Sequence, residues 1–163
     1  MNNTEQAEKV RSIIEDTPTC MMVTSSPNGM TSRPMHVAKY DEQSNLWFLT
    51  DEDSSKVTEI YNDNEVLLTF SDDSDNHYLS LNGKASIVDD QAIKNELFNV
   101  FAKAWFPDGP TSEKLTLIKV DADNAEYWDG SSSKLVQLFK IGKAVLTNQK
   151  YESSKETHGA VAL

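Results

Sequence analysis

Apolar residues recur along this chain with two different spacings, which separate the expected helices from the expected strands. Over residues 4–15 they return every three or four positions, which predicts a helix that buries Ala7, Val10, Ile13 and Ile14. Compact apolar runs over 19–25, 30–40 and 46–50 are bounded by polar turns and predict strands. Between the first two, Asn28-Gly29 suits the positive φ of a hairpin turn.

The second half of the chain repeats this alternation of strands and shorter helices. We expect a short helix at 55–61 and strands at 65–71, 77–88, 115–120 and 125–129, with a turn at 121–124. A helix from residue 89 or 90 to about 105 would bury a stripe formed by Ile93, Leu97, Val100, Phe101 and Ala104. A last helix is expected after the serines at 131–133.

Neighbouring strands joined by short turns indicate an antiparallel meander. The predicted class is α+β and mainly β, a split β-barrel of six to seven antiparallel strands with flanking helices. Gly83 lies inside the longest strand and predicts a bulge or a close backbone contact there. We expect one domain over 1–148 and a flexible polar tail over 149–163.

Composition and charge narrow the kinds of partner. The net charge of −11 disfavours general binding to nucleic acid or to anionic membrane surfaces. No apolar run approaches the ~20 residues that cross a bilayer, and the first residues lack a signal-peptide core. A single cysteine, Cys20, rules out an internal disulfide. The chain is therefore expected to be cytoplasmic.

One stretch combines features of a phosphate site. Arg33 lies near the start of one predicted strand, Thr50 ends the next, and Ser54-Ser55-Lys56 opens a helix. Backbone N–H groups and the dipole at a helix start favour an anion, and an arginine adds a forked pair of hydrogen bonds. The plainer interpretation is a serine N-cap beside solvated cations.

Other chemistry finds little support in the sequence. His36, His77 and His158 lack metal-ligand spacing, so no metal is expected. Cys20 lies in an apolar strand and is expected to be a buried, inert thiol. No side chain stands out as a catalytic acid, base or nucleophile. Tyr78 and Trp128 are either core aromatics or flat walls against a planar cofactor.

Four strings of the sequence resemble one protein family. They are SRPMHVAKYDEQSNLWFLT, the DEDSSK that follows it, LSLNGKASIVDD, and AEYWDGSSSKLVQLFK. With the order of elements, these strings are similar to the pyridoxamine 5′-phosphate oxidase-like, FMN-binding split β-barrel proteins, and most similar to their general stress protein 26 branch. The resemblance covers roughly residues 8–148.

The resemblance implies an FMN site between the two subunits of a homodimer. By position in the motifs, the phosphate of the FMN would contact Arg33, Thr50, Ser55 and Lys56. The flavin ring would contact the strand residues Pro34, Met35, His36, Val37 and Leu49. Tyr78 falls where the oxidases place a polar flavin contact. Trp128 matches an aromatic residue that reaches the flavin from the partner subunit.

One departure from the oxidases limits what the resemblance implies about the reaction. After their tryptophan the oxidases carry an R-L-H-D-R-type segment that binds pyridoxal phosphate. Here the chain reads Asp129-Gly130-Ser131-Ser132-Ser133, and Arg33 is its last arginine. We therefore do not expect pyridoxamine phosphate oxidation.

The leading hypothesis is a homodimeric FMN-binding protein of the general stress type, an oxidoreductase of unknown substrate. One alternative is a flavin-binding protein without turnover that sequesters the cofactor or senses it. A second alternative is that the pocket binds FAD, a deazaflavin or haem. The least specific alternative is a dimeric interaction protein with an empty cleft. Trp105 and Phe106 either close over the cleft or pack in the dimer interface.

Overall fold

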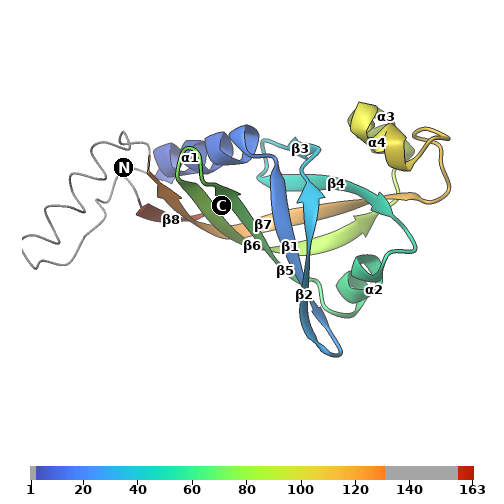
Figure 1. Cartoon of the computed structure of the whole chain (residues 1–163), viewed down its shortest axis with the longest axis horizontal. Coiled ribbons are helices and arrows are strands. Elements are labelled where there is room, and N and C mark those ends of the chain that lie inside the picture. The colour runs from blue at the N-terminus through green and yellow to red at the C-terminus, as the bar shows by residue number, and fades with distance from the viewer. Residues whose placement is uncertain (1–2, 131–157) are drawn as a thin grey trace, which may run out of the picture.

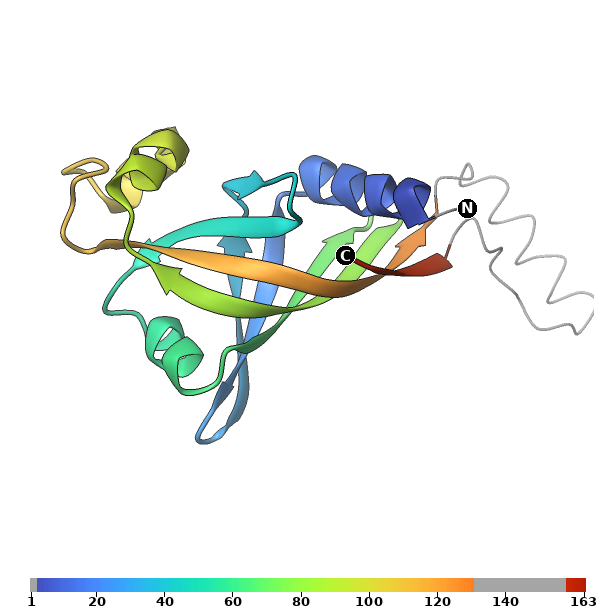
Figure 2. The same cartoon turned by 180° about the vertical axis from the view of Figure 1, so that it is seen from behind.

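The computed structural model describes residues 3–130 and 158–163, and Figures 1 and 2 show it from two opposite sides. Strands dominate, and helices lie at the ends of the sheet. In chain order the elements are α1 (Asn3–Asp16), β1 (Thr19–Ser26), β2 (Gly29–His36), β3 (Lys39–Tyr40), β4 (Asn45–Asp51), α2 (Ser55–Asn62), β5 (Glu65–Asp72), β6 (His77–Val88), α3 (Gln91–Leu97), α4 (Val100–Trp105), β7 (Leu115–Asp129) and β8 (His158–Ala162).

All described strands belong to one antiparallel sheet. Its order is β2-β1-β5-β6-β7-β4-β3, and β8 pairs with the second half of β7. The two end strands of this path, β2 and β3, do not pair with each other, so the sheet is open. This arrangement confirms the predicted mainly β class with flanking helices. The eight described strands exceed the expected six to seven, because β3 and β8 were not foreseen as separate strands, while two expected strands form the single β7.

Helix α1 packs its apolar face on the sheet, as its periodicity predicts. Val10, Ile13 and Ile14 are at most 1% exposed, whereas Ala7, which was also expected to be buried, is half-buried. They join a core built from the inward positions of β1, β5, β6 and β7. Burying each such side chain stabilises the fold by about 1.5–3 kcal/mol. The helix therefore anchors the chain to one end of the sheet, away from α3 and α4 (Figure 1).

Gly83 marks the irregularity that its position predicts. The register between β6 and β7 shifts at Asn82 and Gly83. A Cβ atom added to Gly83 would lie 2.5 Å from the carbonyl oxygen of Asp121. The backbones of the two strands therefore approach closely where the sheet bends.

The strand expected over 30–40 ends earlier. β2 stops at His36, and the short β3 follows after two residues. The N–H of Val37 donates to the carbonyl of Pro18 at 2.7 Å, and that of Ala38 donates to the carbonyl of Trp47 at 2.8 Å. The chain thus changes its pairing partner from β1 to β4 at this corner, which no local sequence signal indicates.

The two strands expected at 115–120 and 125–129 are one continuous strand, and the predicted turn at 121–124 is wrong. Although Asp121, Asp123 and Asn124 resemble turn residues, they occupy exposed positions of β7, whereas Ala122 and Ala125 are buried. β6 pairs with β7 along its length. Long-range pairing here overrides the local preference of polar residues for turns.

The long helix expected up to residue 105 is also wrong, because it divides into α3 and α4. The Asn99 side chain accepts a hydrogen bond from the N–H of Ala102 at 2.9 Å and so caps a new helix. Of the predicted buried stripe only Leu97 is buried, and Val100 and Phe101 are 75% and 71% exposed. Their apolar side chains are therefore available to a site or a surface.

The C-terminal tail expected to be flexible ends instead in a strand. Residues 158–162 form β8, which pairs with residues 124–128 of β7. The polar tail has little helical periodicity, and its strand needs β7 as a template. The last expected helix, after residue 133, and residues 149–157 lie outside the described part of the chain.

Candidate functional site

A cavity of about 610 Å³ opens between the ends of β2 and β4 and the helix α4. This volume falls within the range of small-molecule and cofactor pockets. The strands meet here because the corner after His36 brings β2 beside β4. The cavity is lined by Thr19, Arg33, Pro34, Met35, His36, Ala38, Leu49, Thr50, Asp51, Lys56, Asn99, Phe101, Ala102, Trp105 and Phe106.

Most of the predicted flavin contacts come together in this lining. From β2 they are Arg33 to His36, and from β4 they are Leu49 and Thr50. α2 contributes Lys56. Two others lie next to the cavity without lining it. Val37 is buried, 7% exposed, and Ser55 is an exposed residue at the start of α2. The grouping made from one stretch of sequence therefore corresponds to one place in the fold.

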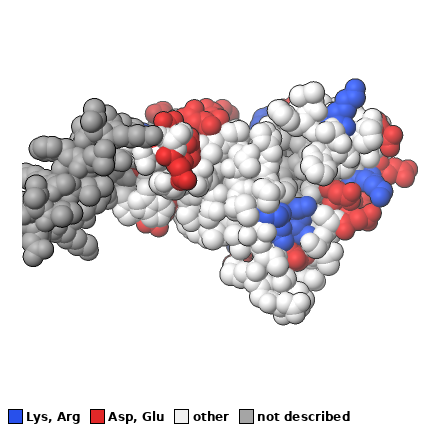
Figure 3. Space-filling model, viewed as in Figure 1, with Lys and Arg blue, Asp and Glu red and all other residues white. Residues whose placement is uncertain are grey.

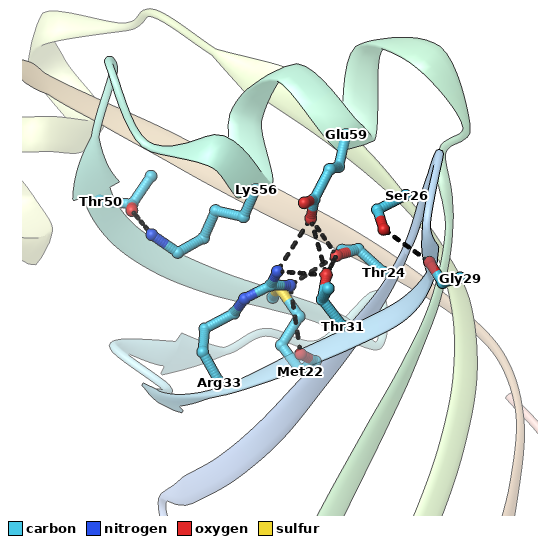
Figure 4. A network of polar contacts seen from close by, with 9 residues as sticks. All are labelled: Met22, Thr24, Ser26, Gly29, Thr31, Arg33, Thr50, Lys56 and Glu59. Atoms are coloured by element: carbon cyan, nitrogen blue, oxygen red, sulfur yellow. Dashed lines mark hydrogen bonds and ion pairs between the residues drawn. The ribbon is translucent and has the colours of Figure 1, made fainter.

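Lys56 is the cation that points along the cavity wall toward β4. Its Nζ atom donates to the Thr50 hydroxyl at 2.8 Å (Figure 4). Burial lowers the pKa of Lys56, and the nearby positive charge of Arg33 lowers it further. The negative charge of an anion bound here would favour the charged form of Lys56 and so oppose both effects. Two donors, an ammonium and a hydroxyl, thus lie side by side at the end of β4.

Arg33 is held by acceptors on three elements. One of its terminal nitrogens donates to the Thr24 hydroxyl at 2.5 Å and to the carbonyl of Met22 at 3.4 Å. The other donates to the Thr31 hydroxyl and to the Glu59 carboxylate, each at 2.8 Å. Figure 4 shows this network between β1, β2 and α2. The fork of the guanidinium is therefore occupied by protein acceptors.

The surface of this region differs from the overall acidic charge. Figure 3 shows a basic patch over β2, with acidic side chains next to it toward the connection between β4 and α2. Net charge describes the whole chain, whereas a bound anion responds to the local field. The chain's −11 is thus compatible with an anion site here.

Aromatic residues of α4 and of the position after it form a wall of the cavity. Phe101 lies with its ring centroid 5.9 Å from that of His36, across the cavity from β2. Trp105 and Phe106 also line the cavity. Both residues therefore border the cleft of their own chain, and packing in a dimer interface stays a prediction. Phe101 was expected in the buried stripe of a longer helix, so its place in the cavity wall was not foreseen.

Tyr78 and Trp128 lie elsewhere in the chain. They are directly opposite each other on β6 and β7, and each is 37% exposed. Trp128 stacks on the ring of His158 from β8, with centroids 5.0 Å apart. The cavity residue Thr50 lies opposite Thr116 on β7. Trp128 follows Thr116 by twelve residues on that strand, which corresponds to roughly 40 Å between them along the strand. Within one chain these two aromatics do not reach the cavity.

The thiol, a metal site and membrane-spanning helices are the other features that the sequence raised. Cys20 is 2% exposed, which confirms that the thiol is buried, and burial raises its pKa to about 12. In the described ranges, 3–130 and 158–163, no three side chains of His, Cys, Asp or Glu gather as a metal site. No described helix is long and apolar enough to span a membrane.

Comparisons with known proteins agree with this architecture. The family model "Pyridoxamine 5′-phosphate oxidase like" matches residues 5–152. The crystal structure of general stress protein 26 from Bacillus anthracis is 30% identical, covers 74% of this chain and 91% of that one, and superposes with a TM-score of 0.67. That of the general stress FMN/FAD binding protein from Xanthomonas citri is 27% identical, covers 80% and 92%, and superposes with a TM-score of 0.70.

A more distant relative is protein bli-3 of Neurospora crassa, 25% identical over 112 residues. The match covers 64% of this chain and 54% of that protein, so it spans about half the length of the relative.

The fold and these matches define the class: a split-barrel protein with a cofactor-sized cavity at the β2–β4 corner. The chain belongs to the pyridoxamine 5′-phosphate oxidase-like family, and its solved relatives include general stress protein 26. This confirms the resemblance that the four sequence strings carry.

Proposed function

We propose that this chain is an FMN-binding protein of the general stress type. The observation that carries the proposal is the cavity in which Lys56, Thr50 and Arg33 meet at one end, while Phe101 and Trp105 line the wall formed by α4. Cationic and hydroxyl donors suit a phosphate, and aromatic or apolar walls suit a planar ring. The general stress FMN/FAD binding protein from Xanthomonas citri supports a flavin as the ligand.

Redox chemistry would be supplied by the isoalloxazine ring. The chain's own residues would bind and orient the flavin: β2 and β4 along the ring, and Lys56 with Thr50 at the phosphate. The cavity wall of α4 would keep water from one side of the ring. We propose an oxidoreductase whose substrate is not pyridoxamine phosphate, because the arginine-histidine segment of the oxidases is absent from the sequence.

We also propose that the protein works as a homodimer with flavin at the subunit interface. Trp128 lies roughly 40 Å along β7 from the cavity end of its own chain, and Tyr78 lies opposite it on β6. If they contact the flavin, as their motif positions imply, they must come from a second copy.

Titration of the apoprotein with FMN, riboflavin and FAD, followed by flavin fluorescence, tests the cofactor. We expect FMN to bind most tightly, because riboflavin lacks the phosphate. An intense Soret band in the purified protein, or no flavin binding by a folded protein, would contradict the proposal. Bleaching of bound FMN by NADH or NADPH would support an oxidoreductase, and no bleaching by either would favour sequestration or sensing.

Lys56→Ala tests the phosphate position. The variant should lose about 1.5–3 kcal/mol of FMN binding, the scale of a hydrogen bond to a charged group, and should bind riboflavin as before. The matched control is Lys84→Ala, which removes an exposed lysine on β6. Arg33→Ala is expected to lose a similar amount. Unchanged FMN affinity in both cavity variants would show that the phosphate lies elsewhere.

A further inference from the structure

Glu59 is an acidic residue next to the proposed phosphate position that sequence analysis did not single out, and it pairs with Arg33 of the cavity lining. It lies on α2 one helical turn after Lys56, and its side chain is 13% exposed. One carboxylate oxygen accepts hydrogen bonds from the hydroxyls of Thr24 and Thr31 and from Arg33. Figure 4 shows these three donors around the Glu59 carboxylate.

A count of donors shows what this arrangement means for an anion. A guanidinium has five N–H groups, four of them on the terminal nitrogens. All four terminal groups of Arg33 already have acceptors in Thr24, Thr31, Glu59 and the Met22 carbonyl. A phosphate that takes a forked pair from Arg33 must therefore replace at least one of these acceptors.

Among these four acceptors only Glu59 carries a negative charge, so the charge around Arg33 changes most when a phosphate takes the place of Glu59. Hydrogen bonds from Thr24 and Arg33, together with the Arg33 charge, lower the pKa of Glu59, so it is ionised at neutral pH. A carboxylate and a phosphate that share one guanidinium repel each other. Lys56 is different, because only one of its three N–H groups is directed at Thr50.

We propose that Glu59 is a built-in competitor for the phosphate of the ligand: it shares the fork of Arg33 and thereby sets how strongly the site prefers phosphate-bearing over phosphate-free flavins. This inference rests on the proposed flavin function. Arg33 and Lys56 bring two positive charges to the site, and the carboxylates of Glu59 and of Asp51 in the cavity lining offset them. Of these two acids, Glu59 is the one that is hydrogen-bonded to Arg33.

Glu59→Gln is the direct test, since it keeps the size of the side chain and removes its charge. We expect FMN to bind about fivefold more tightly, the order expected for removing one like charge near ~5 Å at a high effective dielectric constant. Riboflavin affinity should stay the same, so the FMN-to-riboflavin preference rises by that factor. Glu65→Gln, an exposed residue on β5, gives the same change in net charge and should leave the preference unchanged.

The other outcomes are equally informative. A fall in FMN affinity with unchanged riboflavin affinity would make Glu59 a positioning residue for Arg33 and overturn the competitor role. An unchanged preference, or an equal rise in the Glu65 variant, would overturn it as well.

A second measurement avoids any effect of the substitution on folding. In the wild-type protein, the side-chain carboxyl carbon of Glu59 can be titrated by NMR with and without FMN. Competition predicts that ligand raises the pKa of Glu59 toward its ordinary value, because Arg33 turns to the phosphate. A pKa that stays the same or falls on binding would contradict the proposal.

Inorganic phosphate separates this inference from the flavin function. If the wild-type protein binds no flavin but phosphate raises the pKa of Glu59 in the same titration, the competitor role stands and the proposed function fails. If FMN binds and the Glu59 signal does not respond to FMN or phosphate, the function stands and this inference fails.

Discussion

At the scale of single residues, the site depends on how two cations are held. Arg33 and Lys56 both line the cavity, yet their surroundings differ. Arg33 is bound by Glu59 and two threonines, whereas Lys56 has a hydroxyl, Thr50, as its hydrogen-bond acceptor. The same carboxylate that we expect to weaken phosphate binding thus stabilises the folded chain by pairing with Arg33.

The pH dependence of stability tests that second role. Because the pKa of Glu59 is lowered in the folded state, its contribution is present above the ordinary value of 4.5 and is lost as pH falls through the lowered value. At neutral pH, Glu59→Gln should therefore reduce the free energy of unfolding by about 1 kcal/mol. The difference from wild type should shrink below pH 4.5. Urea unfolding at several pH values measures it, and a difference that grows toward acid pH would contradict the assignment.

At the scale of elements, β7 connects the cavity to the far end of the sheet. Its first half pairs with β4, which carries Thr50, and its second half pairs with β8. β8 packs closely on this half: a Cβ atom on Gly159 would lie 2.5 Å from the hydroxyl oxygen of Tyr127. Since Tyr127 is fully buried, its ring has little room to move.

Gly159→Val is therefore expected to separate β8 from β7. The added atoms overlap Tyr127, and we expect a loss of about 1–3 kcal/mol in unfolding free energy. Hydrogen exchange should accelerate in residues 124–128, the part of β7 that β8 covers. Ala160→Val, at the neighbouring exposed position, is the matched control and should keep the protection of wild type. Equal exchange in both variants would show that the close contact is not needed for pairing.

At the scale of the whole molecule, the two groups of predicted flavin contacts lie at opposite ends of the sheet. The cavity residues surround the β2–β4 corner, and Tyr78 and Trp128 lie near β8. A homodimer that places the cavity end of one chain against the β8 end of its partner would bring both groups of residues together at one flavin. FMN binding by a mixture of two variants can test this proposed assembly.

Complementation between two variants gives the sharpest test. Lys56→Ala and Trp128→Leu should each weaken FMN binding, measured by flavin fluorescence, and each should keep the dimeric mass in light scattering. In a mixed dimer, one site would combine Lys56 from the Trp128 variant with Trp128 from the Lys56 variant. Mixing should therefore restore tight binding at one site per mixed dimer. No restoration after subunit exchange, or a monomeric wild type, would show that each chain builds its site alone.

The sequence by itself determined those features that depend on neighbouring residues. The face of α1, the hairpin at Asn28-Gly29 and the irregularity at Gly83 follow from periodicity and backbone freedom. Arg33, Thr50 and Lys56 could be grouped because they lie within 24 residues of one another, on elements that meet at one corner.

Only the tertiary structure decided the features that depend on residues far apart in the chain. β7 continues through Asp121–Asn124, because β6 pairs with it along its length. The chain turns at Val37 because Pro18 and Trp47 supply new hydrogen-bond partners. The α4 wall and the hold of Glu59 on Arg33 likewise join residues separated by 26 positions or more. Local propensities act over a few residues, whereas these contacts form only once the sheet brings distant segments together.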